Sequence, residues 1–407
     1  MQRTMAEPAA PAATLLDALA RAPAAAALVV AALDQQDDRK ALRLAHPLLR
    51  DAVGEATTKL RLDSAAGAAG AARPPMARRW PLLEELAMRC PDLAALEALG
   101  AETWGRLHSL HVQTSGERYA LDPPSARALA AALLQMPALS VLGLWRVALP
   151  GAFAALLDAP TFALRRVVLT RCDLDATALP HLSNAHWPLE ELDISSNDFR
   201  AAAAGPALAA LSQHARLRKL DVASCHLSAA GFKALVEAAW PALAYLDAGG
   251  AGVAFAGPHA LGAAAFAGFP ALEQLDLAEV VLGEAGAQVL AGRRWPRLRV
   301  LNLDSTVLGD AGLAALARGE WPALEELSLD DCGLSTASAR TLACGPWRAL
   351  RHLALGSNEF DDDDLAVLAR GAWPALETLE LFDNDFEEEP TLEEVRRWAP
   401  ALVELRQ

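Results

Sequence analysis

Residues 295–321 read WPRLRVLNLDSTVLGDAGLAALARGEW, and this stretch decides the fold because variants of it recur along the chain. The segments WPALAYLDA, WPALEELSLDDC, WRALRHLALGSN and WPALETLELFDN begin at Trp240, Trp321, Trp347 and Trp373. The last three follow Trp295 at intervals of 26 residues. A fixed period of this length predicts a stack of similar structural units.

Each unit carries the pattern L-x-x-L-x-L, which in the quoted stretch is Leu298, Leu301 and Leu303. We call the first leucine of each pattern the anchor. The alternation predicts a short strand that buries every second side chain. The anchors are Leu107, Leu139, Leu164, Leu189, Leu217, Leu243, Leu272, Leu298, Leu324, Leu350, Leu376 and Leu402, with Leu83 as a weaker first member.

The eighth position after the anchor is usually Cys, Asn or Thr. These residues are Cys172, Asn197, Cys225, Thr306, Cys332, Asn358 and Asn384. Stacked repeats bury the backbone of the turn there, so an inward polar side chain is expected to bond to it. Three of the five cysteines fall on this row, which favours a structural role for them over a redox or metal site.

A helical stretch follows each turn, and a Trp-Pro pair commonly closes the unit. Proline cannot continue a helix and makes the preceding residue extended, so the pair ends the helix and starts the next strand. A tryptophan that recurs at this junction is expected to pack in the core. The predicted unit is therefore strand, turn, helix and return.

The pattern L-x-x-L-x-L-x-x-(N/C/T)-x-L followed by a helix resembles the leucine-rich repeat over residues 79–407. The 26-residue unit with Cys at the eighth position is similar to the cysteine-containing subclass found in F-box proteins. The L-x-x-x-G-x-x-x-L helix resembles the ribonuclease-inhibitor subclass. The resemblance implies an α/β solenoid, a right-handed horseshoe with parallel strands on the concave face and helices on the convex face, which binds another protein.

The first eighty residues differ from the repeats. Residues 1–13 are rich in Ala and Pro and are expected to be disordered, whereas residues 14–63 predict a small module of short amphipathic helices without a strand. Residues 64–78 have the composition of a flexible linker.

The helical segment resembles a degenerate F-box, the module that docks on the Skp adaptor of cullin ubiquitin ligases. It lacks the usual Leu-Pro opening, and no Trp follows Arg50. The candidate adaptor-docking residues are Leu28, Val29, Leu33, Leu42, Leu44 and Leu49. The alternative is a cap over the first layer of the solenoid.

The candidate partner-binding residues lie between the leucines of the strands, on the concave face. The fourth position after the anchor holds an aspartate in four successive repeats, and Arg and Trp residues gather near the first complete repeats. The candidates are Trp145, Arg146, Arg166, Arg171, Asp193, Asp221, Asp247, Asp276, Asp304, Asp330, Asp331, Glu380, Phe382 and Asp383. They predict either a solvated polar face or a groove for a basic segment, with Trp145 and Phe382 as aromatic anchors.

Composition narrows the function. A net charge of −15 argues against a nucleic-acid partner, and the ten-residue apolar run at 24–33 is too short to span a bilayer. An odd number of cysteines without a CxxC pair favours a reducing compartment, which we expect to be the cytoplasm, with nuclear, ciliary or cytoskeletal locations as alternatives. No motif predicts catalysis, a cofactor, a metal or a small-molecule substrate.

We therefore expect a non-enzymatic interaction scaffold, in one version the substrate receptor of a cullin-type ubiquitin ligase. A structural scaffold of a cytoskeletal or ciliary assembly is a second hypothesis. A third is a GTPase-activating protein of the Ran-directed type, although the long acidic tail usual in that family is missing.

Overall fold

The computed structural model describes residues 59–62, 82–89, 93–101, 103–113, 119–120, 123–148, 163–250, 261–387 and 390–406. The chain forms two compact units, one of Met1–Gly143 with Ala159–Ala163 and one of Leu144–Asp158 with Leu164–Gln407. The repeat pattern predicts one uninterrupted solenoid from residue 79, so this division is not visible in the sequence.

The first unit combines parallel strands with two helices. Its elements are β1 (Lys59–Leu62), β2 (Glu85–Arg89), α6 (Leu93–Gly100), β3 (Ser109–Gln113), β4 (Tyr119–Ala120) and α7 (Pro123–Leu134). Strands β1, β2 and β3 pair in parallel in that order, with Leu60, Leu86 and Leu110 opposite one another and buried. Helix α6 packs against α7.

Strand β1 corrects one predicted boundary. The sequence predicts helices throughout residues 14–63, but Lys59–Leu62 is a strand that pairs with β2. The alternation of Lys, Leu, Arg and Leu explains it, because Leu60 is buried while Lys59 forms an ion pair with Glu85 at 2.9 Å. The predicted tail, the rest of the helical module, the linker and the six adaptor-docking candidates lie outside the described residues.

The second unit repeats strand and helix many times, and β5 (Val141–Trp145) spans the boundary before it. Its first half contains β6 (Val147–Ala148), β7 (Arg166–Thr170), α9 (Leu179–Asn184), β8 (Glu191–Asp193), α10 (Ala204–Ala210), the 3-10 helix η2 (Leu211–Gln213), β9 (Lys219–Asp221), α11 (Ala229–Glu237) and β10 (Tyr245–Asp247). Its second half contains β11 (Gln274–Asp276), α12 (Gly283–Ala291), β12 (Val300–Asn302), α13 (Gly309–Leu316), β13 (Glu326–Ser328), α14 (Thr336–Cys344), β14 (His352–Ala354), α15 (Asp362–Leu368), β15 (Thr378–Glu380), α16 (Leu392–Arg396) and β16 (Glu404–Arg406).

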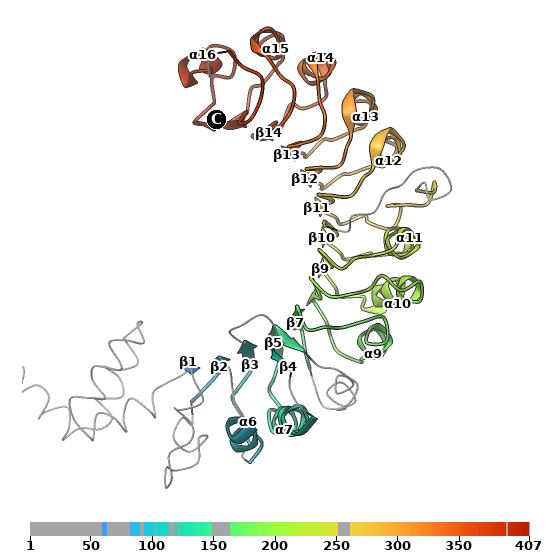
Figure 1. The fold of residues 1–407 in the computed structure, drawn as a ribbon, viewed down its shortest axis with the longest axis vertical. Helices are drawn as coiled ribbons and strands as arrows, with labels where there is room; N and C mark the ends of the chain where they lie inside the picture. The colour runs from blue at the N-terminus through green and yellow to red at the C-terminus, as the bar shows by residue number, and fades with distance from the viewer. Residues whose placement is uncertain are drawn as a thin grey trace, which may run out of the picture. The chain divides into compact units, whose positions relative to one another are not determined.

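Strands β7 to β16 pair in parallel, each with the next along the chain. The register is one whole repeat, so that Leu301 stands opposite both Leu275 and Leu327. Within this unit the strands line the inner side of the curve and the helices its outer side (Figure 1). The predicted α/β leucine-rich repeat solenoid is therefore confirmed.

The eighth position has the expected structural role. The side-chain oxygen of Asn197 accepts hydrogen bonds from the backbone N–H groups of Cys172 and Leu174, both at 3.0 Å. Its amide group donates to the carbonyls of Leu169 and Ile194. Asn197 therefore ties its own turn to that of the preceding repeat.

The three cysteines of this row are buried and free, and their thiols donate to backbone carbonyls. Burial raises the pKa of Cys172 and of Cys225 to about 12 and that of Cys332 to about 11. These thiols fill the turn and satisfy its backbone. The structural interpretation of the cysteine row fits this geometry.

The tryptophans that close the units take part in a run of ring contacts that we call the aromatic column. It passes from Trp240 through Phe269, Phe266 and Trp295 to Trp321. Trp295 and Trp321 stack with their ring centroids 6.4 Å apart and an interplanar angle of 9°. Each indole N–H of this column donates to the carbonyl of the residue five positions earlier, as Trp321 does to Leu316 at 2.9 Å. The expected core role of the tryptophans is confirmed at these positions.

The seventh position after the anchor is a corner with left-handed backbone. Its φ lies between 50° and 64° at Arg146, Arg171, Ser196, Ser224, Gly250, Glu279, Ser305, Asp331, Ser357 and Asp383. At each of these corners up to Ser357, the N–H group donates to a carbonyl of the next repeat, as Ser305 does to that of Asp330 at 2.8 Å. Sequence periodicity assigns this position to the strand face, whereas it turns the chain.

Candidate partner-binding face

Four aspartates stand side by side on the strands of the second unit, and we call them the acidic ladder. Asp193, Asp221, Asp247 and Asp276 lie on β8 to β11 and face one another in register across each strand pair. Neighbouring strands in a sheet lie about 4.8 Å apart. The row that the leucine spacing predicts therefore exists, and its charges are close neighbours.

The ladder side chains are half-buried, which differs from the expectation that they simply point into solvent. In each, the Oδ1 atom accepts the backbone N–H group two residues further along. The donors are Ser195 at 3.0 Å, Ala223 at 3.1 Å, Gly249 at 3.0 Å and Ala278 at 3.0 Å. Each aspartate thus accepts a backbone hydrogen bond at the end of its own strand and also places a negative charge on the strand face.

The charges of the ladder repel one another. Burial, together with the neighbouring Asp193 and Asp247, raises the pKa of Asp221 to about 7. Burial and then Asp276 also raise the pKa of Asp247, against the hydrogen bond from the Gly249 N–H group. Positive charge brought against this row would relieve that repulsion.

Lys219 and Tyr245 belong to the same face, and the sequence reasoning did not single them out. The Lys219 ammonium lies 4.3 Å from the centre of the Tyr245 ring, and the Tyr245 hydroxyl donates to Asp247 at 3.4 Å. Both residues stand two positions before a ladder aspartate, so alternation along the strand could have found them.

Two further acids extend the face beyond the ladder. Asp304 accepts from the Ser328 hydroxyl at 2.6 Å and from the Asp330 N–H group at 2.9 Å. Asp330 in turn accepts from the Gly356 N–H group at 2.6 Å. Burial, then the nearby Asp304, raises the pKa of Asp330 to about 6. These acids also combine a backbone contact with unfavourable charge.

The predicted basic and aromatic end lies on strands β5 and β7 and on the corners that follow them. Arg166 lies on β7 and pairs with Glu191 at 3.2 Å, which cancels its charge locally. Arg146 and Arg171 are exposed at left-handed corners, and Trp145 is half-buried at the end of β5. Arg146 and Arg171 thus occupy equivalent corners of neighbouring repeats, where the Arg146 N–H group bonds to the Thr170 carbonyl at 3.0 Å.

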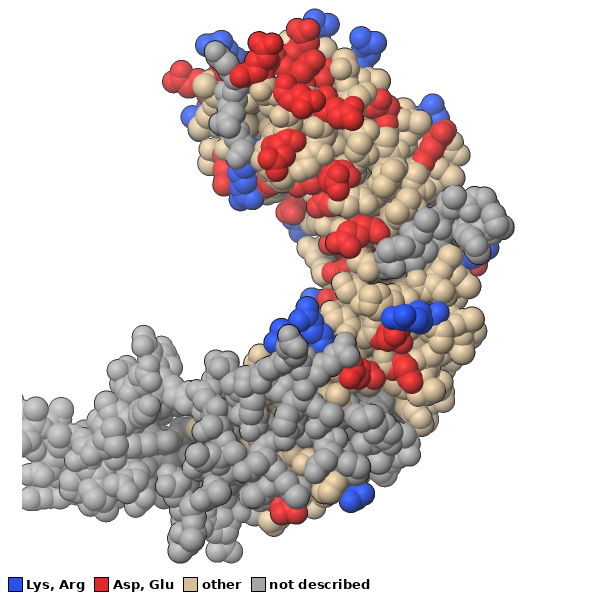
Figure 2. Space-filling view, in the orientation of Figure 1, with Lys and Arg blue, Asp and Glu red and all other residues tan. Residues whose placement is uncertain are grey.

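The remaining candidates lie toward the last repeats. Glu380 pairs with Arg406 at 2.7 Å, and the Phe382 ring packs over Gly356 in the space that a Cβ atom there would need. Asp331 and Asp383 are exposed at corners, and Asp331 accepts from the Ser305 hydroxyl at 3.0 Å. Figure 2 shows acidic side chains gathered over this part of the unit, with basic ones between them.

A neighbouring row of the same strands carries paired charges. At the first position after the anchor, Arg299 pairs with Glu325 at 2.6 Å and Arg351 with Glu377 at 2.7 Å. These pairs are exposed and hold one repeat against the next. Because they neutralise each other, the uncompensated charge of the face is concentrated on the ladder and its extension.

Within the described residues, no three His, Cys, Asp or Glu side chains converge so as to hold a metal ion. No helix in that part of the chain is both long and apolar enough to cross a bilayer.

Comparison with known proteins gives a match for part of one repeat. A family model described as Leucine Rich repeat matches residues 297–317, which run from the strand of β12 through helix α13. No curated protein matches the chain.

Solved structures resemble the chain at low identity. The yeast Rad7 and Elc1 complex has a TM-score of 0.43 at 16% identity, with 98% of each chain covered. The TLR13–ssRNA13 complex has a TM-score of 0.44 at 16% identity, over 85% of this chain and 52% of the other, so that this chain spans about half of it. An internalin from Listeria monocytogenes has a TM-score of 0.46 at 14% identity, over 81% and 88% of the two chains. The family-model match and the recurring strand, turn and helix identify the described fold as a leucine-rich repeat solenoid.

Proposed function

We propose that this chain is a non-catalytic scaffold that binds a basic segment of a partner protein on strands β8 to β11. The observation that carries the proposal is the acidic ladder, in which aspartates on adjacent parallel strands keep their charges close together. Carboxylates about 5 Å apart repel by roughly 1 kcal/mol in a water-like medium. A Lys or Arg side chain between them would reverse the sign of that interaction.

The fold does not need the negative charge of the ladder. Asn302 stands in register with Asp276 on the next strand, and its side-chain oxygen accepts the Asp304 N–H group at 3.0 Å. An uncharged amide therefore makes the same backbone contact that each ladder aspartate makes. Four carboxylates in succession supply charge that the strand ends do not require, which supports a role in binding.

The spacing of the ladder fits a helix in the partner. An α-helix rises about 5.4 Å per turn, close to the roughly 4.8 Å between strands. A helix lying across the strands, with one Lys or Arg on each turn, would place a cation opposite each aspartate. In an extended partner segment, side chains on one face are about 6.6 Å apart, which does not match the spacing of the ladder aspartates.

A designed lysine helix tests the proposal. The peptide carries one lysine per turn on one face, and its control has the same composition in scrambled order. The double variant Asp221→Asn with Asp247→Asn keeps both backbone acceptors, and Asp363→Asn removes a charge from helix α15. We expect the double variant to weaken binding about tenfold or more and Asp363→Asn to change it little. Equal binding by the wild type and the double variant would refute the proposal.

A finer form of the proposal concerns the N-terminal segment. Its resemblance to an F-box suggests that residues 14–63 hold the Skp adaptor, which would make this chain a cytoplasmic substrate receptor of a cullin-type ligase. Co-purification of the full chain with and without residues 1–58 tests this, because that truncation leaves strand β1 in place. Loss of the adaptor on truncation would support the ligase hypothesis. If the full chain does not retain the adaptor, the hypotheses that remain are a structural scaffold and a GTPase-activating protein.

A further inference from the structure

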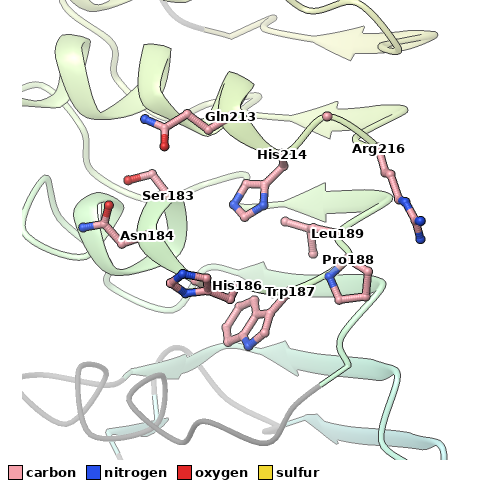
Figure 3. A pocket seen from close by; sticks show the side chains of 11 residues that line it. Ser183, Asn184, His186, Trp187, Pro188, Leu189, Gln213, His214 and Arg216 are labelled. Atoms are coloured by element: carbon pink, nitrogen blue, oxygen red, sulfur yellow. The ribbon is translucent and has the colours of Figure 1, made fainter.

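A groove of about 590 Å³ lies on the second unit, away from the strand face, between the loop after α9 and the loop after η2. Eleven residues line it, at 183–189 and 213–216. Figure 3 shows the His214 imidazole turned toward the loop that carries His186 and Trp187, whereas the Arg216 guanidinium points away. The groove is therefore bounded by two successive helix-to-strand loops of the solenoid.

His214 takes the place that tryptophan holds in later repeats, three residues before the anchor. The N–H group of the anchor Leu217 bonds to the His214 carbonyl at 2.8 Å. In the same way, Leu243 bonds to Trp240 and Leu324 to Trp321, both at 3.4 Å. The backbone is thus equivalent, and the side chain alone has changed.

The aromatic column stops at this substitution. Trp240 packs on Phe269 with 6.4 Å between ring centroids, and the column continues from there toward Trp321. On the other side of Trp240, the smaller His214 ring bonds through Nε2 to the Leu182 carbonyl of the preceding repeat at 2.9 Å. The next indole, Trp187, lies one residue nearer its anchor and forms a wall of the groove.

The lining suits a planar aromatic group with an N–H donor. Trp187, Pro188 and Leu189 supply apolar surface, and no carboxylate is among the eleven lining residues. Ser183 and Asn184 close helix α9, where the Leu182 carbonyl already accepts the Ala185 N–H group and the His214 Nε2 atom. The carbonyls of Ser183 and Asn184 complete this helix end. These carbonyls carry partial negative charge, so they favour an N–H group and disfavour an anion.

From these observations we propose that the groove receives the indole side chain of a tryptophan from a partner protein. The guest ring would lie between Trp187 and His214 and extend the aromatic column across its interruption. Its N–H group would meet the carbonyls of Ser183 and Asn184 at the end of α9, as the column's own indoles meet the carbonyls of Leu235 and Leu290. Most of the ligand surface in such sites is apolar, with few polar contacts.

A second groove at the same place in a later repeat serves as an internal comparison. It has a volume of about 490 Å³ and is lined by Trp321 itself, with Glu320 and Arg348 at its sides. Here the tryptophan position is filled, and its indole already donates to Leu316. We therefore assign the indole site to the His214 groove and not to this one.

The test uses N-acetyltryptophanamide, an uncharged mimic of a tryptophan within a chain, with N-acetylleucinamide as the non-aromatic control and free tryptophan as a metabolite control. Ligand-observed NMR measures binding to the full chain. His214→Trp puts the larger indole of the other repeats at this position, Ala215→Trp blocks the exposed rim, and His352→Trp adds an indole on strand β14 as a matched control.

We expect saturable binding of N-acetyltryptophanamide that either groove variant weakens about tenfold or more, with His352→Trp unchanged. If His214→Trp does not fold, Ala215→Trp alone tests whether blocking the groove weakens binding of the probe. Absence of binding to the wild type, binding that survives both groove variants, equal binding of the leucine probe, or tighter binding of free tryptophan would each overturn the proposal. Because the probe is uncharged, this result is independent of the acidic ladder.

Discussion

Asp221 and Asp247 stand directly opposite each other on β9 and β10, and each holds a backbone N–H group at the end of its own strand. The register of the two strands brings the two negative charges together. The bonds from the backbone N–H groups make each side chain part of the fold. The pair is therefore structurally useful as an oxygen acceptor and electrostatically unfavourable as an anion. This conflict makes the stability of the second unit depend on pH.

Stability should fall as the pH rises through the titration of Asp221. Its folded-state pKa of about 7 lies above the usual value near 3.9, so the folded chain binds more protons than the unfolded chain between these limits. The free energy of unfolding should therefore be larger at pH 5.5 than at pH 8. Urea denaturation of wild type and Asp221→Asn at both values measures it.

At pH 8 the free energy of unfolding of Asp221→Asn should exceed that of the wild type by on the order of 1 kcal/mol, a figure that allows for solvent screening of a half-buried group. The variant's unfolding free energy should also change less between pH 5.5 and pH 8. The Asp363→Asn variant is the control, because its charge lies on helix α15 and not on the ladder. An unchanged pH dependence in Asp221→Asn would show that the ladder carries no electrostatic strain.

Asn197 should be among the most sensitive polar positions of the solenoid. Replacement by alanine removes acceptors and donors that satisfy Cys172, Leu174, Leu169 and Ile194 in a buried turn. We expect a loss of about 2–4 kcal/mol in unfolding free energy. Asn197→Cys should cost less, because Cys225 holds the equivalent position. Equal losses in chemical denaturation would argue against backbone bonding as the reason for this row.

Trp321 and Trp347 form a matched pair for the indole hydrogen bond. Both rings are buried, but the Trp321 N–H group donates to Leu316, whereas the Trp347 Nε1 atom has no hydrogen-bond partner. Substitution by phenylalanine should therefore destabilise the protein more at 321 than at 347, by about 1 kcal/mol. Thermal and urea unfolding of both variants measure the two losses in unfolding free energy. Equal losses would show that packing alone, without the indole hydrogen bond, accounts for the stability that these tryptophans provide.

Alkylation should separate the cysteines by burial. Cys172, Cys225 and Cys332 are buried with pKa values raised to about 11–12, whereas Cys344 is exposed at the end of α14. Iodoacetamide at pH 8 should modify Cys344 in the native protein and should reach Cys172, Cys225 and Cys332 only after unfolding in urea. Peptide mass spectrometry reads the sites. Rapid native modification of Cys332 would contradict the buried row.

The sequence was sufficient to predict the strands and the ladder, because both depend on period. Leucines at the anchor, third and fifth positions fix which side chains are buried, and one repeat per strand places Asp193 opposite Asp221. Asp361 caps helix α15 by accepting the Asp364 N–H group, as a carboxylate just before a helix is expected to do. These features follow from local pattern and stacking.

Other features depend on dihedral angles and on size, which the pattern does not encode. The corner at the seventh position holds Arg, Ser, Asp, Glu and Gly alike, so composition gave no sign of left-handed backbone. The second role of Asp247, as acceptor of the Gly249 N–H group, needs the strand to end where it does. The equivalence of His214 with the tryptophans of later repeats was not recognised from the sequence. It became clear from the bond between the His214 carbonyl and the anchor Leu217.

Site-specific photo-cross-linking of the lysine helix tests the central claim most directly. A benzoylphenylalanine replaces Tyr245 beside the ladder in one protein and Lys233 on the outer helix α11 in another. The account predicts cross-links from position 245 that disappear in the Asp221→Asn, Asp247→Asn background, with few from position 233. Equal cross-linking at both positions, or cross-linking at 245 that persists without the two charges, would contradict it.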